Sequence, residues 1–156
     1  MFNAISGART LHRLLYASRQ TFTRQMIPNQ EIDALIHASI RNNAAAEISG
    51  LLLVHDGWFV QALEGQAAAV MNTYRRIVDD PRHAQARVIS AGPAARREFG
   101  NWNMCARRFS LADDAILDTL KQRKDFDPAR LSESAALRLL TAVRGVQQRT
   151  GLVAPA

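Results

Sequence analysis

Two adjacent amide side chains stand at the end of a segment whose apolar residues repeat at helical spacing. The residues that share one face of this helix, at positions i, i+4, i+7 and i+8, are Leu35, Ser39, Asn42 and Asn43. A buried amide needs a partner, because an unmade hydrogen bond costs about 1–3 kcal/mol. The pair therefore indicates either a polar ligand at the inner end of the helix or a helix C-cap, where Asn is favoured.

A third amide, Gln61, lies in a segment of strand-like alternation. The residues of one face are Phe59, Gln61 and Leu63, and those of the other face are Trp58, Val60 and Ala62. Because both sets are largely apolar, the periodicity leaves two interpretations open. Gln61 is either a buried amide that offers two donors and an acceptor, or a solvent-facing residue of an ordinary strand.

Five further side chains could take part in chemistry or could be purely structural. Tyr16 ends an apolar run, and a phenol at such a place is either a functional group or an ordinary core aromatic. Arg76 and Asp80 are four residues apart on a second helical stripe, which is also the spacing of a surface ion pair. Trp102 and Met104 share one face of a last strand and could simply belong to the core. None of the five identifies a site alone.

The combination of these residues is more informative than any member. A planar heteroaromatic ring with carbonyls and ring nitrogens needs amide partners at its edge and aliphatic walls on its faces. Asn42, Asn43 and Gln61 offer the amides, and Leu35 and Ile77 offer the walls. A slot between two helices over a sheet would accommodate such a ring.

The elements that position these groups follow the order β-α-β-β-α-β-β. The predicted strands are Leu11–Ala17, Ile48–Val54, Trp58–Leu63, Arg87–Ala91 and Asn103–Phe109. The predicted helices run from Asn29 to Asn43 and from Val70 to Asp80, and Gly65 is expected to end the hairpin. This order is the split βαβ pattern of a ferredoxin-like α+β fold, with two helices on one face of a mixed sheet.

The remaining segments lie at the two ends of the chain. Beyond Phe109 the sequence predicts a helical cap with helices at Ala112–Lys121 and Glu133–Gln148. We therefore expect a flexible tail at 1–10, one ferredoxin-like domain at 11–110 and a C-terminal helical extension at 111–156.

Composition restricts the class of protein. Of 156 residues, 47% are hydrophobic, so a core can be buried, and the single cysteine, Cys105, excludes an internal disulfide or a cysteine-based zinc site. No segment approaches the roughly 20 apolar residues that span a bilayer, and the start lacks the apolar run of a signal peptide. A cytoplasmic protein is expected. The net charge of +6 comes mainly from scattered arginines, which favours a solvated surface over a nucleic-acid footprint.

Six stretches of the sequence resemble the BLUF domain, a blue-light sensor that uses flavin. In chain order they are Arg13–Ser18, Ser39–Asn43, Ile48–Gly50, Phe59–Gly65, Tyr74–His83 and Arg97–Met104. Each motif is weak alone, but six in the right order and spacing are specific. The resemblance covers about residues 11 to 110, and the residues after Ser110 look like the helical cap of short, single-domain members.

The resemblance implies a role for each matching position. Tyr16 corresponds to the photoactive tyrosine that donates an electron to excited flavin, and Gln61 to the glutamine that bridges this tyrosine and the ring. Asn43 corresponds to the amide at the polar edge of the ring, with Asn42 supporting it. The other implied flavin-binding residues are Leu35, Ser39, Phe59, Arg76, Ile77, Asp80 and His83. Trp102 and Met104 correspond to the pair linked to signal output.

The resemblance also implies the cofactor and the mode of output. FAD is expected, with FMN or riboflavin as alternatives, held without a covalent bond. Light is expected to rearrange the hydrogen bonds among Tyr16, Gln61 and flavin. The signal would then pass to a protein partner in trans, either a signalling enzyme or a transcription regulator, or through a homo-oligomer, and no enzymatic activity is expected. One departure is Ala62, where some members carry a tryptophan.

A ferredoxin-like module that binds nucleic acid, or regulates without photochemistry, is the alternative. The basic charge favours it, but the aromatic strand pattern of RNA-binding domains is missing.

Overall fold

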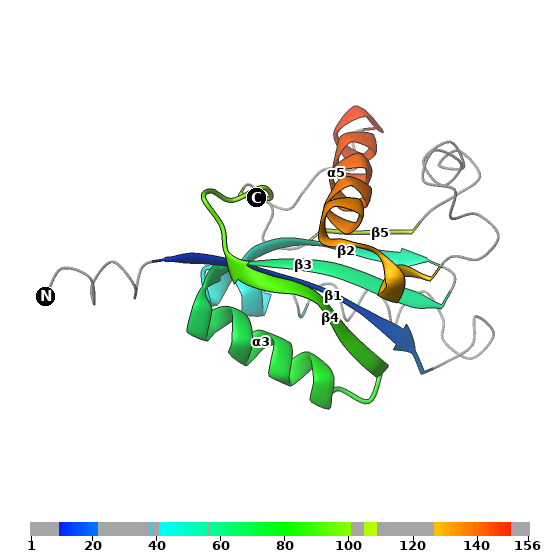
Figure 1. Cartoon of the computed structure of the whole chain (residues 1–156), viewed down its shortest axis with the longest axis horizontal. Helices are drawn as coiled ribbons and strands as arrows, with labels where there is room; N and C mark the ends of the chain where they lie inside the picture. Colours follow the sequence, from blue (N-terminus) through cyan, green and yellow to red (C-terminus); the bar gives the residue numbers. More distant parts are fainter. Residues whose placement is uncertain are drawn as a thin grey trace, which may run out of the picture.

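A five-stranded sheet forms the centre of the computed structural model, which describes residues 10–21, 38, 41–55, 57–100, 105–108 and 127–150 (Figure 1). The strands are β1 (Leu11–Gln20), β2 (Ser49–His55), β3 (Trp58–Gln66), β4 (His83–Pro93) and β5 (Cys105–Arg108). Their order across the sheet is β4-β1-β3-β2-β5. The first four pair antiparallel, and β5 pairs parallel to β2. The ferredoxin-like fold is thereby confirmed.

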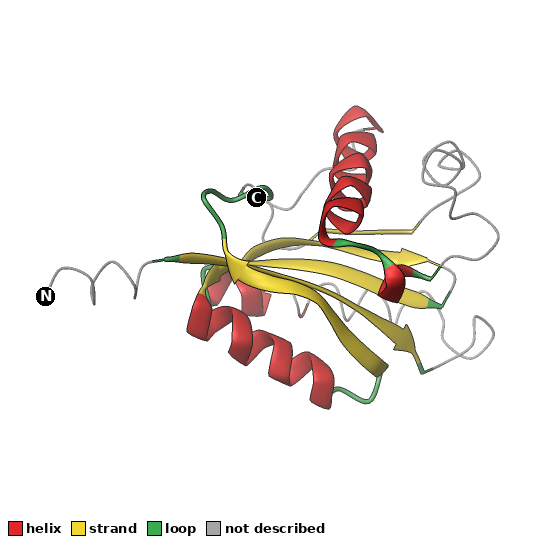
Figure 2. Cartoon of the chain, viewed as in Figure 1, coloured by secondary structure: helices red, strands yellow, loops and turns green. Residues whose placement is uncertain are grey.

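Helices cover both faces of this sheet (Figure 2). Helix α3 (Ala67–Asp79) lies on one face, together with a helical turn at residues 41–45. On the opposite face lie the 3-10 turn η2 (Pro128–Arg130) and helix α5 (Glu133–Thr150). The Ser132 hydroxyl accepts the Ala135 N–H at 3.1 Å, so Ser132 caps the start of α5. No helix in the described part of the chain has the length and apolar character needed to cross a membrane.

The two sheet faces bury separate apolar clusters, because β1 and β3 are interior strands that are covered on both sides. The cluster under α3 contains Leu14, Tyr16, Ile48, Leu52, Val54, Phe59, Leu63 and Val70. The cluster under α5 contains Leu15, Ala17, Leu51, Leu53, Trp58, Val60, Ala62, Phe99, Ala136, Leu139, Leu140 and Val143. The alternation expected for β3 is confirmed, but neither of its faces meets solvent.

Several boundaries differ from the sequence-based prediction. β4 is longer than expected and begins at His83, and β3 continues through Gly65 to Gln66, so Gly65 does not end the hairpin. The helical spacing of Val70, Tyr74, Ile77 and Val78 also predicts one apolar stripe on α3, but Val78 is 46% exposed and the buried residues of α3 are Val70 and Thr73. Most of the predicted first helix and all of the predicted Ala112–Lys121 helix lie outside the described residues.

Gly65 of β3 allows the chain segment after the 41–45 turn to pack closely on the sheet. A Cβ atom at this position would lie 3.2 Å from the Glu47 carbonyl oxygen and 3.2 Å from Ile48 Cγ1. Both distances are shorter than ordinary van der Waals contact. A side chain here would therefore push the turn away from the strand.

We predict that Gly65→Ala destabilises the fold by about 1–3 kcal/mol, the usual cost of overpacking. Gly92→Ala is the matched control, because Gly92 lies in another strand of the same sheet and a Cβ there would meet no atom within 4 Å. Urea denaturation of both variants measures the difference. Equal stability of the two variants would contradict the close approach at Gly65.

Candidate functional site

A pocket lies between the sheet and α3, on the face opposite α5. Its wall is built from β1, β2, β3, the 41–45 turn, α3 and the connection from α3 to β4. The lining residues are Tyr16, Ala38, Asn42, Asn43, Leu52, Gln61, Thr73, Arg76, Ile77, Asp80, Arg82 and His83. The pocket has a volume of about 110 Å³ and is partly open to solvent, so a molecule the size of flavin would not be fully enclosed by it. An open groove at Arg76 and residues 79–82 adjoins it, so such a ligand would extend into the groove.

Tyr16 and Gln61 form a hydrogen-bonded pair at the floor of the pocket. The antiparallel register of β1 and β3 places the two residues directly opposite each other, and both point toward α3. The Tyr16 hydroxyl donates to Gln61 Oε1, and the side chains are 0% and 3% exposed. The interpretation of Gln61 as a solvent-facing residue is therefore wrong.

Burial keeps the Tyr16 phenol protonated. Loss of solvation raises the pKa of Tyr16 well above its ordinary value, and the nearby Tyr74 and Asp80 raise it further. The Tyr74 ring lies beside it, with 5.3 Å between the ring centroids. At neutral pH Tyr16 thus keeps its proton, and in this structure its hydroxyl donates that proton to the Gln61 oxygen.

Asn43 is fixed by the turn that follows it. The Ile48 N–H donates to the Asn43 carbonyl at 2.8 Å, and the Glu47 N–H donates to the Ala44 carbonyl at 3.2 Å. This is a Schellman motif in which Glu47, at φ 57°, takes the left-handed position after the helix. The predicted alternative, an Asn pair serving as the C-cap, is wrong because the helical residues continue to position 45.

The two adjacent asparagines differ in their surroundings. Asn43 is 2% exposed, whereas Asn42 is exposed although it also lines the pocket. Asn43 Nδ2 and Thr73 Oγ1 are buried and have no hydrogen-bond partner within the described residues. Both atoms belong to residues that line the pocket. A ligand with hydrogen-bonding groups at its edge would satisfy them, so the donor set fits a flavin ring.

His83 closes one side of the pocket. It is 9% exposed, its Nδ1 lies 2.8 Å from the Ser18 hydroxyl, and its ring stacks at 4.4 Å on the fully buried Phe59. Burial lowers the pKa of His83 to about 4; the charge of Arg82 acts in the same direction and that of Asp80 opposes it. The imidazole is therefore neutral at neutral pH.

Asp80 pairs with Arg82 and not with Arg76, the partner that the helical spacing left open. Its carboxylate accepts hydrogen bonds from the Arg82 side chain at 2.6 and 2.9 Å, rather than from Arg76 one turn earlier in α3. These bonds lower the pKa of Asp80. Arg76 is exposed and Ile77 is half-buried, and both line the pocket.

The pocket brings most of the predicted residues together and adds others. Tyr16, Asn42, Asn43, Gln61, Arg76, Ile77, Asp80 and His83 all line it, and Phe59 packs beneath His83. Leu35, Ser39, Trp102 and Met104 lie outside the described residues. The residues missed from the sequence are Ser18, Ala38, Leu52, Thr73 and Arg82. Spacing could have found two of them, because Ser18 is two residues after Tyr16 on β1 and Thr73 is four before Ile77 on α3.

We predict that His83 makes the fold less stable in acid. Below pH 6.5 the unfolded chain binds a proton at His83 that the folded pocket does not accept until about pH 4. The free energy of unfolding should therefore fall across this window by up to about 3 kcal/mol. His83→Gln should lose this component, and His12→Gln, on a half-buried residue away from the pocket, should keep it. Urea midpoints between pH 7 and pH 4 test this, and identical pH profiles for wild type and His83→Gln would contradict it.

Comparisons with known proteins identify the family of this chain. The family model described as BLUF, sensors of blue-light using FAD, matches residues 11–105. The beta subunit of a photoactivated adenylate cyclase from Euglena gracilis is 35% identical over 100 residues, covering 64% of this chain and 11% of that protein. A blue light- and temperature-regulated antirepressor from Escherichia coli K12 is 32% identical over 94 residues, covering 60% of this chain and 23% of that protein.

Solved structures give the same result. The dark-state structure of BlrB, a BLUF protein, superposes with a TM-score of 0.70 at 27% identity, covering 87% of this chain and 98% of that one. A bacterial light-regulated adenylyl cyclase gives a TM-score of 0.65 at 29% identity, covering 72% of this chain and 34% of that one. The chain spans about a tenth of the length of the cyclase subunits it matches. These matches support the flavin sensor over the nucleic-acid-binding alternative, and the chain belongs to the BLUF family of blue-light sensors that use FAD.

Proposed function

We propose that Tyr16 and Gln61 are the light-responsive pair of this sensor and that Asn43, Thr73 and Gln61 bind the polar edge of the flavin ring. The observation that carries the proposal is the buried Tyr16–Gln61 hydrogen bond in the same pocket as two unpartnered polar atoms. When bound, the flavin supplies the absorption of blue light and an electron acceptor.

Gln61 is the member of the pair that can change its hydrogen bonding. A carboxamide has a donor end and an acceptor end, and it exchanges them by rotation or tautomerisation. Tyr16 holds its proton at a single hydroxyl, and its raised pKa keeps that proton in place before illumination. A rearranged Gln61 would leave the pocket with a different set of donors and acceptors around an unchanged ligand.

The remaining pocket residues have supporting roles in this proposal. Leu52 and Ile77 provide apolar walls, and Arg76 lies at the rim where the pocket meets the open groove. Asp80 lines both the pocket and this groove, and His83 lines the pocket, so both are proposed to face the chain attached to the ring. The low pKa of His83 keeps that side free of an additional positive charge at neutral pH.

The output is proposed to act on a protein partner in trans, in the cytoplasm, without a catalytic centre in this chain. The matched relatives include proteins named as adenylate cyclase subunits and as an antirepressor, so a signalling enzyme and a transcription regulator are both candidate classes. A homo-oligomer is the other route. Helix α5 supports either route, because it covers the sheet face opposite the pocket.

We predict that the protein is yellow and that blue light shifts its flavin absorption to longer wavelength. Tyr16→Phe and Gln61→Leu should keep flavin but lose this shift, because each removes one side of the hydrogen bond. Tyr74→Phe is the matched control, since it removes a neighbouring hydroxyl outside the pair. Absorption spectra before and after illumination measure the effect. A normal red shift in Gln61→Leu would rule out this pair as the responsive element.

We predict that Asn43→Ala weakens flavin binding by about two- to tenfold, the factor expected for one neutral hydrogen bond. Asn42→Ala and Arg76→Ala should weaken it less, because both side chains are exposed and partly solvated. Fluorescence titration with FAD measures the dissociation constants. Unchanged affinity in Asn43→Ala would count against the assignment of the ring edge.

A further inference from the structure

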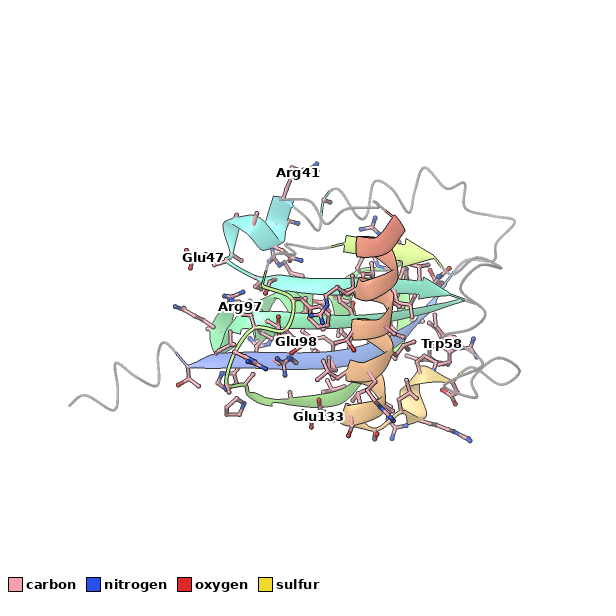
Figure 3. The ribbon with its side chains drawn as sticks, turned by 90° about the horizontal axis from the view of Figure 1, so that it is seen from above. Arg41, Glu47, Trp58, Arg97, Glu98 and Glu133 are labelled. Carbon is pink, nitrogen blue, oxygen red and sulfur yellow. The ribbon has the colours of Figure 1, made fainter. Side chains whose placement is uncertain are left out.

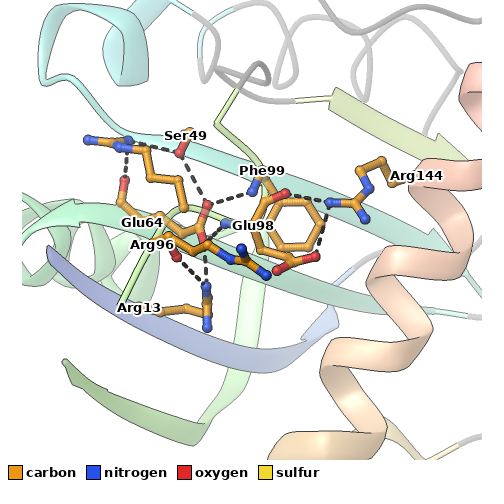
Figure 4. Close-up of polar contacts among 8 residues, drawn as sticks. Arg13, Ser49, Glu64, Arg96, Glu98, Phe99 and Arg144 are labelled. Atoms are coloured by element: carbon orange, nitrogen blue, oxygen red, sulfur yellow. Dashed lines mark hydrogen bonds and ion pairs between the residues drawn. The ribbon is translucent and has the colours of Figure 1, made fainter. Parts of the chain in front are cut away.

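The segment Arg96–Phe99, called here the clamp segment, links three parts of the structure that are distant in sequence (Figure 4). It follows β4 and leads toward β5. Its first anchor is Glu64 of β3, which is fully buried. The Glu64 carboxylate accepts the backbone N–H groups of Glu98 at 2.7 Å and Phe99 at 2.8 Å. The Arg13 side chain donates to the same carboxylate at 2.8 Å.

Glu64 ties the clamp segment to the strand that carries Gln61. The two residues are three apart on β3, so they point to opposite faces of the sheet, Gln61 toward the pocket and Glu64 toward α5. The hydroxyl of Ser49 on β2 also donates to Glu64, at 3.3 Å. A buried carboxylate with this many donors is held tightly, and its bonds are of the stronger, charge-assisted kind.

The second anchor is the turn that follows Asn43. Arg97 donates from Nη2 to the Glu47 carbonyl at 2.9 Å, and from Nη1 to the Ser49 hydroxyl at 2.8 Å and the Glu64 carbonyl at 3.1 Å. Glu47 is the residue with positive φ in the Schellman motif, and its neighbour Ile48 donates to the Asn43 backbone. One guanidinium therefore bridges the turn that fixes Asn43 and the strand that carries Gln61.

The third anchor is helix α5. Arg144 donates to the Glu98 carbonyl, approaches Glu98 Oε1 at 3.3 Å and lies 5.5 Å from the centroid of the Phe99 ring. Phe99 is fully buried and packs in the core cluster with Leu139 and other α5 residues. In the view from above, Arg97 and Glu98 lie on the α5 side of the sheet, with Glu47 at the nearby edge (Figure 3).

We propose that Arg97 is a positioning residue for Asn43 and that the clamp segment couples the flavin pocket to helix α5. The proposal rests on the proposed function, because it takes Asn43 and Gln61 as flavin ligands. Arg97 of the segment holds the turn that follows Asn43, Glu64 holds the segment to the strand that carries Gln61, and Arg144 holds the segment to α5. A change in the pocket that moves the segment would alter its contacts with Arg144 and Phe99, and by reciprocity a change at α5 would alter the pocket.

The proposed link between Arg97 and Asn43, called here the pocket arm, is tested with Arg97→Gln in the full chain. Arg96→Gln is the matched control. In the control, the Arg96 carbonyl that accepts from Arg13 is retained. Arg97→Gln should raise the FAD dissociation constant, and should speed amide exchange at Glu47 and Ile48 in flavin-free protein, each by about two- to fivefold, because the Arg97 side chain is exposed and acts on the ligand only through the turn. Arg97→Lys should recover part of both effects, because it keeps the charge but not the two-armed geometry.

Three outcomes overturn the pocket arm. They are wild-type exchange at Glu47 and Ile48 in Arg97→Gln, wild-type FAD affinity in that variant, and equal effects of Arg97→Gln and Arg96→Gln. The exchange measurement uses no flavin. If the wild-type protein failed to bind FAD or to shift its absorption, the proposed function would fail, whereas the exchange result would still report on the turn.

The proposed link between the clamp segment and helix α5, called here the α5 arm, is tested with Arg144→Gln. This substitution leaves the pocket residues unchanged. Illumination of the wild type should change amide exchange in the stretch 133–144 of α5. Arg144→Gln should keep the red shift but lose this light-dependent change, and Arg138→Gln, an exposed arginine of the same helix, should retain it. A wild type without any light-dependent exchange in α5, or an Arg144→Gln variant with the full wild-type change, would refute the coupling.

Discussion

The antiparallel register of β1 and β3 is the constraint on which both halves of this molecule depend. It places Tyr16 opposite Gln61 on the pocket face and Arg13 opposite Glu64 on the face toward α5. A slip of one residue would turn every side chain of one strand to the other face, and both pairs would be lost together. The light-responsive bond and the anchor of the clamp segment are thus set by a single pairing of two buried strands.

The buried polar groups on the two faces of the sheet differ in their hydrogen bonding. The Glu64 carboxylate receives two backbone N–H groups, a guanidinium and a hydroxyl, so the chain itself compensates its loss of water. On the other face, Asn43 Nδ2 and Thr73 Oγ1 are buried without partners among the described residues. Natural folds leave few such atoms uncompensated. This contrast separates a network that stabilises the fold from a site built for a ligand.

Sequence reasoning was most successful where one physical signal decided the structure. Helix α3 and the alternating faces of β3 follow from periodicity. Periodicity did not decide whether Gln61 is buried, because both faces of an interior strand are apolar. Its burial follows only from the helices that cover both faces of the sheet. The spacing of Arg76 and Asp80 left a surface ion pair open, but the Asp80 carboxylate bonds to Arg82, two residues later in the turn. The contacts of Arg97 could not be predicted from residue types, because two of its three acceptors are backbone carbonyls.

The conformation of the turn after Asn43 depends on contacts with other parts of the chain. Glu47 has a left-handed backbone, which costs a residue other than glycine about 1–2 kcal/mol. Such a conformation persists only when its surroundings enforce it. Two contacts do so from different sides: the bare Cα of Gly65 lets the turn pack on β3, and the Arg97 guanidinium holds the Glu47 carbonyl. The position of Asn43 is therefore governed by residues outside the pocket, and any movement of the clamp segment acts on an element already under strain.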